Sequence, residues 1–361
     1  IKLMKKKIKI KILSSSFKYP NVRSFLFPFI LFDKHFIENK IECCINPKNN
    51  LKVFDIIFIE SNFFGKNWNL KPDNVLEEIY KLKKKCNKII YFDLSDSTTI
   101  LHPRALEVVD IYYKGQIFKN KNLYKKKFYG RRIYTDYSHK KFNIIDSKPV
   151  FSEIIDKPKN LDKIKLSWNS SISNYSLLGK YFNEFYQRIP LRFLIDFPSK
   201  RSTNKNKKKD IMLRMNFFYQ RNTIAWHRKI VLESIKNKVD YEKINTINYF
   251  RELNNSKITI SPFGWGEINY RDYEAFIYGS LLLKPDMSHI ETWPNYFENY
   301  KTTIFYDWSC NNLGKTIEKI LSNYEHYEEI IENAKEKYFY YLNKKNLKEK
   351  ILKFLKKTID Y

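Results

Sequence analysis

The sequence predicts an α/β protein made of two halves, each built on a parallel sheet. Short apolar runs of strand length alternate with amphipathic helical stretches in both halves of the 361-residue chain. The run at 53–60 (VFDIIFIE) is apolar almost throughout, which is typical of parallel strands buried on both faces. The stretch at 257–285 has the pattern strand, loop, helix, strand, and this unit joins parallel neighbours in an open sheet.

The first half is expected to begin with a strand, because Lys alternates with Ile over the first residues and gives that strand one wet face. Residues 72–85 favour a helix with Val75, Ile79 and Leu82 on one side, and Pro103 is a favoured first residue of a short helix. The other expectations are strands at 7–13, 53–60, 88–94, 110–113 and 191–197, a helix at 177–187, and loop and linker at 152–168.

The polar, low-complexity run at 198–210 has a composition that cannot form a core, so it is either the connection between the two halves or an exposed loop beside that connection. The tail places Leu347, Ile351, Phe354 and Leu355 on one helical face, with lysines elsewhere. The predicted domains are 1–197, 198–340 and a final helix at 341–361. The other expectations are strands at 210–215, 257–261, 280–284 and 302–306, and helices at 222–236, 270–278 and 313–341.

The formal charge of +28 admits two explanations. It can reflect an anionic partner such as nucleic acid, a membrane face or a phosphorylated substrate, or a Lys-, Asn- and Ile-rich composition at tolerant surface positions. The four cysteines lack the spacing of a metal site or disulfide framework, so we expect reduced thiols and a cytoplasmic protein. No apolar run approaches the roughly 20 residues that span a bilayer.

The unit at 257–285 carries three charged residues, Glu267, Arg271 and Glu274, spaced i, i+4, i+7. If the helix begins at the preceding loop, all three project from one face near its N-terminus. A charged stripe does not face a core, so the pattern predicts a polar site at the carboxyl end of a strand, where open α/β sheets bind ligands. The alternative is a glycine-containing turn with an Arg–Glu pair on the helix surface.

The segment 261–294, S-P-F-G-W-G-E…R-D-Y-E-A…G-S-L-L-L-K-P-D-M…W-P, resembles the donor half of GT-B glycosyltransferases. The resemblance is in particular to the family-1-like bacterial and viral transferases grouped with CgeB and exostosin-type sequences. In the first half, Y-F-D-L-S-D-S-T-T, V-D-I-Y-Y-K and Y-G-R-R-I-Y-T-D-Y are similar to strings in the acceptor half of such proteins.

This resemblance implies an α/β GT-B fold, with two facing Rossmann-like domains and a C-terminal helix that crosses back to the first. It implies a metal-independent enzyme, without a cofactor, that moves a sugar from a nucleotide-sugar donor to a saccharide or lipid-linked acceptor in surface-polymer synthesis. Many family members carry an E-x7-E pair. Here Glu267 and Glu274 are seven apart, one residue short of that pattern. Glu274 matches the ribose-contacting glutamate, and Glu267 stays a candidate catalytic residue without a defined role.

Transfer without a metal requires protein groups that neutralise the leaving diphosphate. Gly264 and Gly266 would let the backbone approach a phosphate, and Arg271 can grip it with two hydrogen bonds. Arg214 ends the first strand of the second half and is a further candidate ligand. A solvated arginine is the alternative for Arg214.

Asp96 follows the strand at 88–94 and is the candidate base that deprotonates the acceptor hydroxyl. An Asx turn or a helix cap explains it equally well. The rival function is a basic nucleic-acid-binding protein, although no zinc-ligand, RRM or helix-turn-helix signature supports it and nucleic acid is not an expected partner. A degenerate transferase that binds glycans without turnover is a third possibility. The tail helix and the run at 200–209 could touch an anionic membrane, but packing of the tail on the first domain is the simpler expectation.

Overall fold

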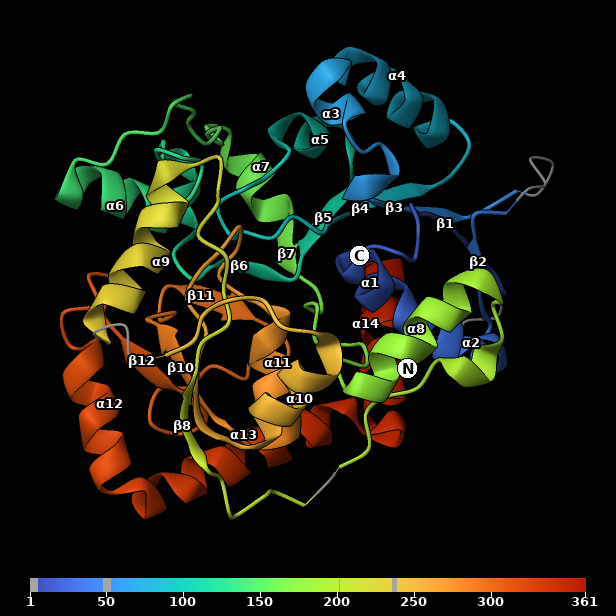
Figure 1. Ribbon diagram of the computed structural model, residues 1–361. Helices are drawn as coiled ribbons and strands as arrows, with labels where there is room; N and C mark the ends of the chain where they lie inside the picture. Colours follow the sequence, from blue (N-terminus) through green and yellow to red (C-terminus); the bar gives the residue numbers. More distant parts are fainter. Residues whose placement is uncertain (1–5, 48–52, 201, 236–238) are drawn as a thin grey trace.

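The computed structural model describes residues 6–47, 53–200, 202–235 and 239–361, and it contains two parallel sheets (Figure 1). Some sequence expectations fall outside the described residues: the start of the alternating N-terminal stretch at 1–5, position 201 of the polar run, and the expected end of a helix at 236.

The first half holds a six-stranded parallel sheet in the order β2-β1-β3-β4-β5-β7. Every residue of β3 is buried, as the apolar run predicts for a central parallel strand. The strands are β1 (Ile8–Leu13), β2 (Ile41–Ile45), β3 (Ile56–Glu60), β4 (Lys88–Asp93), β5 (Ile111–Lys114) and β7 (Ile164–Leu166). The helices are α1 (Pro20–Leu31), α2 (Asp33–Glu38), α3 (Asn67–Leu70), α4 (Pro72–Lys83), α5 (Pro103–Val108), α6 (Ile133–Phe142), α7 (Pro158–Lys163) and α8 (Leu177–Arg188).

The second half holds a four-stranded parallel sheet in the order β12-β10-β9-β8. Helix α11 has the bounds expected from the sequence and ends at Gly279. The φ of this residue is 64°, a left-handed conformation that glycine adopts without the steric cost of a Cβ. The strands are β8 (Lys209–Met212), β9 (Ser256–Ile260), β10 (Leu281–Pro285) and β12 (Ile304–Tyr306). The helices are α9 (Asn222–Ser234), α10 (Thr246–Asn254), α11 (Tyr270–Tyr278), α12 (Leu313–Ser322), α13 (Glu328–Leu342) and α14 (Lys344–Asp360).

Two features tie the halves together. Strand β6 (Gln116–Phe118) of the first half pairs antiparallel with β11 (Ile290–Thr292) of the second, forming a short ribbon. Helix α14 returns to the first half, where the ring of Phe354 lies 4.7 Å from that of Tyr113 on β5. Two parallel α/β halves and a returning C-terminal helix are the features that the GT-B expectation specified, and they are confirmed (Figure 1).

Three sequence expectations about the elements are wrong. The single helix expected at 313–341 is interrupted after Ser322 and forms α12 and α13 with a 3₁₀ turn between them. Residues 191–197 form no strand. They contain the 3₁₀ turn η3 (Arg192–Leu194), and no neighbouring strand lies beside them to accept their hydrogen bonds. Residues 152–168 are more than a linker, because they supply α7 and the edge strand β7, which is three residues long. So short a strand leaves almost no periodic signal. The remaining short turns are η1 (Ser61–Phe63), η2 (Lys121–Lys125) and η4 (Tyr324–Tyr327).

The carboxyl ends of the two sheets meet at their centres. The loop after β9 reaches the loop after β4, where Glu267 accepts a hydrogen bond from the Thr98 backbone N–H at 3.0 Å. Ligands of open α/β sheets bind beyond the carboxyl ends of the strands. The fold therefore places the candidate site between the two halves.

Candidate active site

A cavity of about 840 Å³ lies between the two halves. Its walls in the second half are the segment after β8, the loop 241–245 and the N-terminal parts of α10 and α11, while the first half contributes side chains from α1 and α8. Six cationic side chains and two carboxylates line it, which favours an anionic ligand. The charged lining residues are Arg23, Lys180, Arg214, Arg228, Lys243 and Arg271, with Glu242 and Glu274.

Arg228 is the most enclosed of these cations. It projects from α9, and its Nε donates to the Phe263 carbonyl at 3.1 Å while Nη1 donates to the Asn216 carbonyl at 3.1 Å. Its guanidinium lies 4.8 Å from the centre of the Tyr219 ring. Burial, and to a smaller extent the charge of Arg271, lowers the pKa of Arg228. Within the described residues Arg228 has no ion-pair partner. Its positive charge is therefore available to an anionic ligand.

Arg271 and Glu274 project into the cavity from α11. Arg271 donates from Nη2 to the Arg214 carbonyl, and its buried Nε has no hydrogen-bond partner among the described residues. Glu274 accepts a hydrogen bond of 2.5 Å from the Tyr249 hydroxyl, and burial raises the pKa of its carboxyl. An arginine with a spare donor therefore lies one turn from a carboxylate with spare acceptors.

Arg214 lines the same cavity, but its charge is already neutralised. Its guanidinium forms a two-pronged ion pair with Glu252, with Nη2 at 2.6 Å from Oε2 and Nε at 3.0 Å from the same oxygen. The sequence made Arg214 a candidate because it ends a strand, and Arg228 was not among the candidates. Glu252 on α10 pairs with Arg214 and leaves Arg228 available to a ligand. The sequence around either arginine does not indicate this pairing.

The two loop glycines make room for protein groups. A Cβ on Gly264 would lie 2.7 Å from Arg228 Nη2, and one on Gly266 would overlap the carbonyl of Asp96 in the other half. The close approaches that the structure records are thus to Arg228 and Asp96. The phosphate role expected of the two glycines stays a prediction.

Glu267 does not share a face with Arg271 and Glu274, because α11 begins at Tyr270 and Glu267 lies in the loop before it. That expectation of a common face is corrected. The buried carboxylate of Glu267 accepts from Ser97 Oγ at 3.1 Å, from the Thr98 N–H at 3.0 Å and from Gln116 Nε2 at 3.3 Å. All three donors belong to the first half.

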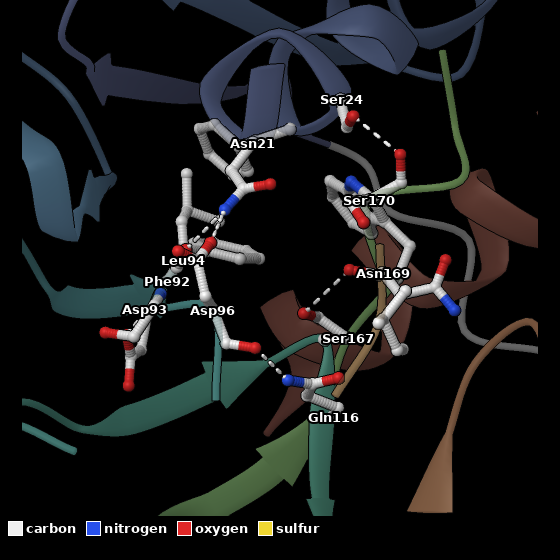
Figure 2. Close-up of a pocket in the computed structure, with 15 residues that line it drawn as sticks. Asn21, Ser24, Phe92, Asp93, Leu94, Asp96, Gln116, Ser167, Asn169 and Ser170 are labelled. Atoms are coloured by element: carbon white, nitrogen blue, oxygen red, sulfur yellow. Dashed lines mark hydrogen bonds between the residues drawn. The ribbon is translucent and has the colours of Figure 1, made fainter. Parts of the chain in front are cut away.

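A smaller recess of about 50 Å³, lined by both polar and apolar side chains, lies beside the carboxyl ends of β4 and β5 (Figure 2). Asp96 stands at its edge, and its Oδ1 accepts a hydrogen bond of 2.7 Å from Asn21 Nδ2. Asn21 in turn accepts one of 2.9 Å from the hydroxyl of Tyr270, which lines the large cavity. Asp96 is therefore connected to the cavity through two hydrogen bonds. Its role as a base stays a prediction.

Asp93, at the end of the same strand, is part of a buried ion pair. Its Oδ2 lies 3.1 Å from Lys114 Nζ, and both side chains are fully buried. Burial alone would raise the pKa of this carboxyl, but Lys114 and the hydrogen bonds from Ser95 outweigh it, so that the pKa is lowered. Asp93 also lines the recess, and its ion pair with Lys114 makes it a structural group there. In the described part of the chain, no group of three or more His, Cys, Asp or Glu side chains is placed to hold a metal ion.

Comparisons with known proteins add the following. No protein-family model matches the chain, and no curated protein matches it. Among solved structures, it is similar to Anabaena Alr3699/HepE in complex with UDP and glucose, with 10% identity and a TM-score of 0.48 over 97% of this chain and 100% of that one. A glycosyltransferase from Rickettsia africae gives 10% identity and 0.48 over 98% of each chain. WaaG, a glycosyltransferase involved in lipopolysaccharide biosynthesis, gives 11% and 0.41 over 96% of this chain and 99% of that one. Likenesses at this identity and TM-score assign no function to the chain.

Proposed function

We propose that this protein is a glycosyltransferase that uses a nucleotide-sugar donor and a saccharide or lipid-linked acceptor. One observation carries the proposal. The cavity between the two sheets holds two arginines, Arg228 and Arg271, that have no carboxylate partner among the described residues, beside a Glu274–Tyr249 pair. Arg228 is buried and Arg271 is half-buried. Removing such guanidinium groups from water without a counter-charge costs free energy, and a bound diphosphate would supply that charge.

In this proposal the diphosphate, the ribose and the base of the donor each contact different side chains of the cavity. Arg228 and Arg271 hold the diphosphate and neutralise the charge that grows on it as the bond to the sugar breaks. Glu274 accepts hydrogen bonds from the ribose hydroxyls. The rings of Phe217 and Tyr241, whose centres are 4.9 Å apart, line the cavity and offer an apolar surface to the base.

Asp96 is the proposed base, with the acceptor hydroxyl between the recess and the cavity. As the acceptor oxygen bonds to the anomeric carbon, its proton passes to the Asp96 carboxylate, and the bond from that carbon to the diphosphate oxygen breaks. Asn21 orients the carboxylate through its 2.7 Å hydrogen bond. Glu267 is better suited to holding the halves in register than to reacting, since its two oxygens are already occupied by donors.

The test is binding of a panel of nucleoside diphosphates and nucleotide-sugars, UDP and UDP-glucose included, followed by titration calorimetry of the best ligand. Arg271→Gln should weaken binding about tenfold or more, because a charge-assisted contact contributes about 1.5–3 kcal/mol. Arg251→Gln, an exposed arginine on α10 outside the cavity, is the matched control and should bind like the wild type. The melting temperature of each variant shows whether it is folded.

Two results would overturn the proposal. One is a folded wild-type protein that binds no member of the panel. The other is salt-sensitive binding of DNA or RNA in the absence of nucleotide-sugar binding, which would favour the nucleic-acid alternative.

A further inference from the structure

Helix α8 and the turn after it expose a continuous row of large apolar side chains. Leu178 is 51% exposed, Phe185 55% and Phe193 77%. On α8 the exposed apolar positions follow the i, i+3, i+4, i+7 spacing of a single helical face, and the exposed polar positions lie around them. We call these residues the α8 surface; its members are Leu178, Tyr181, Phe182, Phe185, Ile189 and Phe193.

The orientation of α8 is the reverse of that of an ordinary surface helix, whose apolar stripe faces the core. Its buried positions are Gly179 and Asn183. Asn183 donates to the Asn174 carbonyl at 3.2 Å, and the Leu177 N–H donates to the Tyr278 hydroxyl at 3.2 Å. Leu177 and Tyr186 also pack partly against the core. The other large apolar side chains of the helix face outward, where the fold offers them no partner.

The charges around this face are mainly basic. Arg188 is the last residue of α8. Lys18 lies close to the helix, because the ring of its neighbour Phe17 packs at a tilt against that of Tyr186 with ring centres 4.7 Å apart. A groove of about 870 Å³ beside Phe193 is lined by four Lys and Arg side chains and two carboxylates. Lys18, Lys34, Arg188 and Lys348 are in no ion pair with any described residue. Charge complementarity therefore favours an anionic partner.

An apolar helical face bordered by unpaired Lys and Arg is the arrangement that lies in the surface of an anionic bilayer, with rings and aliphatic groups below the headgroups. No helix among the described residues is both long and apolar enough to cross a membrane. We propose that the α8 surface docks on an anionic lipid bilayer, with α8 lying in the membrane plane. The tail helix, in contrast, buries its apolar face against the first half and has none to offer.

Docking in this orientation places the cavity next to the bilayer. Lys180 belongs to α8 and also lines the cavity. A membrane-anchored acceptor would then reach the cavity from the lipid surface. This last step rests on the proposed function, whereas the docking itself does not.

The experiment is co-sedimentation of the full chain with vesicles of pure phosphatidylcholine and of an equimolar mixture with phosphatidylglycerol. The wild type should bind the anionic vesicles, and added salt should weaken that binding. The double variant Phe182→Ser/Phe185→Ser should bind these vesicles at least about tenfold more weakly, because the two rings no longer contact the lipid chains. Both side chains are exposed, so the fold should persist. Leu70→Ser/Tyr80→Ser removes two other exposed apolar groups, on α3 and α4, and should bind like the wild type.

Three results would overturn the proposal. The first is a wild type that does not bind anionic vesicles, and the second is a Phe182→Ser/Phe185→Ser variant that binds them as the wild type does. The third is a wild-type dimer in sedimentation velocity that this variant abolishes, without any vesicle binding. That result would assign the face to a second copy of the chain. Nucleoside diphosphate binding by the same variant should equal that of the wild type. If neither the wild type nor the variants bind any nucleotide but the wild type still binds anionic vesicles, the proposed function is refuted and the docking stands.

Discussion

Glu267 is a buried carboxylate that accepts hydrogen bonds from three groups of the opposite half of the molecule, on Ser97, Thr98 and Gln116. Burial raises its pKa above the usual 4.5 even though the Thr98 N–H and Ser97 Oγ stabilise the charged form. Its neighbours in the loop are held as well: Arg132 Nε donates to the Trp265 carbonyl at 2.6 Å, and the Tyr134 hydroxyl donates to the Gly264 carbonyl at 2.8 Å. The loop is therefore clamped to the first half along its length.

The raised pKa of Glu267 gives stability a definite pH dependence. Between the unfolded value of about 4.5 and the higher folded value, the folded protein holds the proton more tightly, so this group's contribution to stability falls as pH rises. Glu267→Gln removes the titrating group and with it this pH-dependent contribution to stability. The difference in free energy of unfolding, wild type minus variant, should decrease as pH rises from about 4.5. Urea denaturation from acidic to neutral pH measures it, and a difference that is flat or grows with pH would contradict the prediction.

Single residues also show where sequence reasoning reaches its limit. Arg271 and Glu274 could be assigned to one helical face because i, i+3 spacing fixes their direction. Arg228 could not be preferred to Arg214, because the choice depends on Glu252, which neutralises Arg214 from a different helix. The ion pair of Asp93 could not be foreseen either, because its partner Lys114 comes from the next strand. Contacts between elements carry no local signature.

At the scale of elements, α8 and α14 have similar apolar spacing and opposite uses. The apolar face of α14 is buried against the first half, while that of α8 is exposed. Periodicity identifies both as helices but does not say which face finds a partner. Strands show the same limit. Residues 191–197 have the composition of a strand, but a strand also needs a neighbour, and the sheet ends at β7.

Leu355 tests the docking of α14. The side chain is fully buried, so Leu355→Ala should lower the free energy of unfolding by about 2–5 kcal/mol through lost apolar contacts and a cavity. Lys353→Ala, at an exposed position of the same helix, should change it by less than about 0.5 kcal/mol. Chemical denaturation with a common slope compares the two. Equal and small effects would mean that α14 contributes little to stability.

At the scale of the whole molecule, the halves are joined by more than the polar connection between them. The β6–β11 ribbon, the loop around Glu267 and helix α14 each cross from one half to the other. The α/β class and the two-half organisation were predictable, because strands and helices alternate along the chain. The ribbon was not, since its strands are three residues long and 172 positions separate their pairing residues Phe118 and Ile290.

These contacts predict that the connection can be cut without separating the halves. The described residues from Ser199 to Lys208 are mostly exposed and rich in lysine, so trypsin should cleave there first. The two fragments should then run separately in a denaturing gel but elute together in native size-exclusion chromatography. Separate elution would show that the crossing contacts do not hold the halves by themselves.

The β6–β11 ribbon also has a practical consequence. Since each half supplies one strand of it, each half presents an unpaired edge that only the other completes. Two polypeptides produced from separate genes, divided within the connection, should therefore find each other and rebuild the cavity. One of them can carry isotopic labels while the other remains unlabelled, which would bring each half of a 43.9 kDa protein within easier reach of NMR spectroscopy.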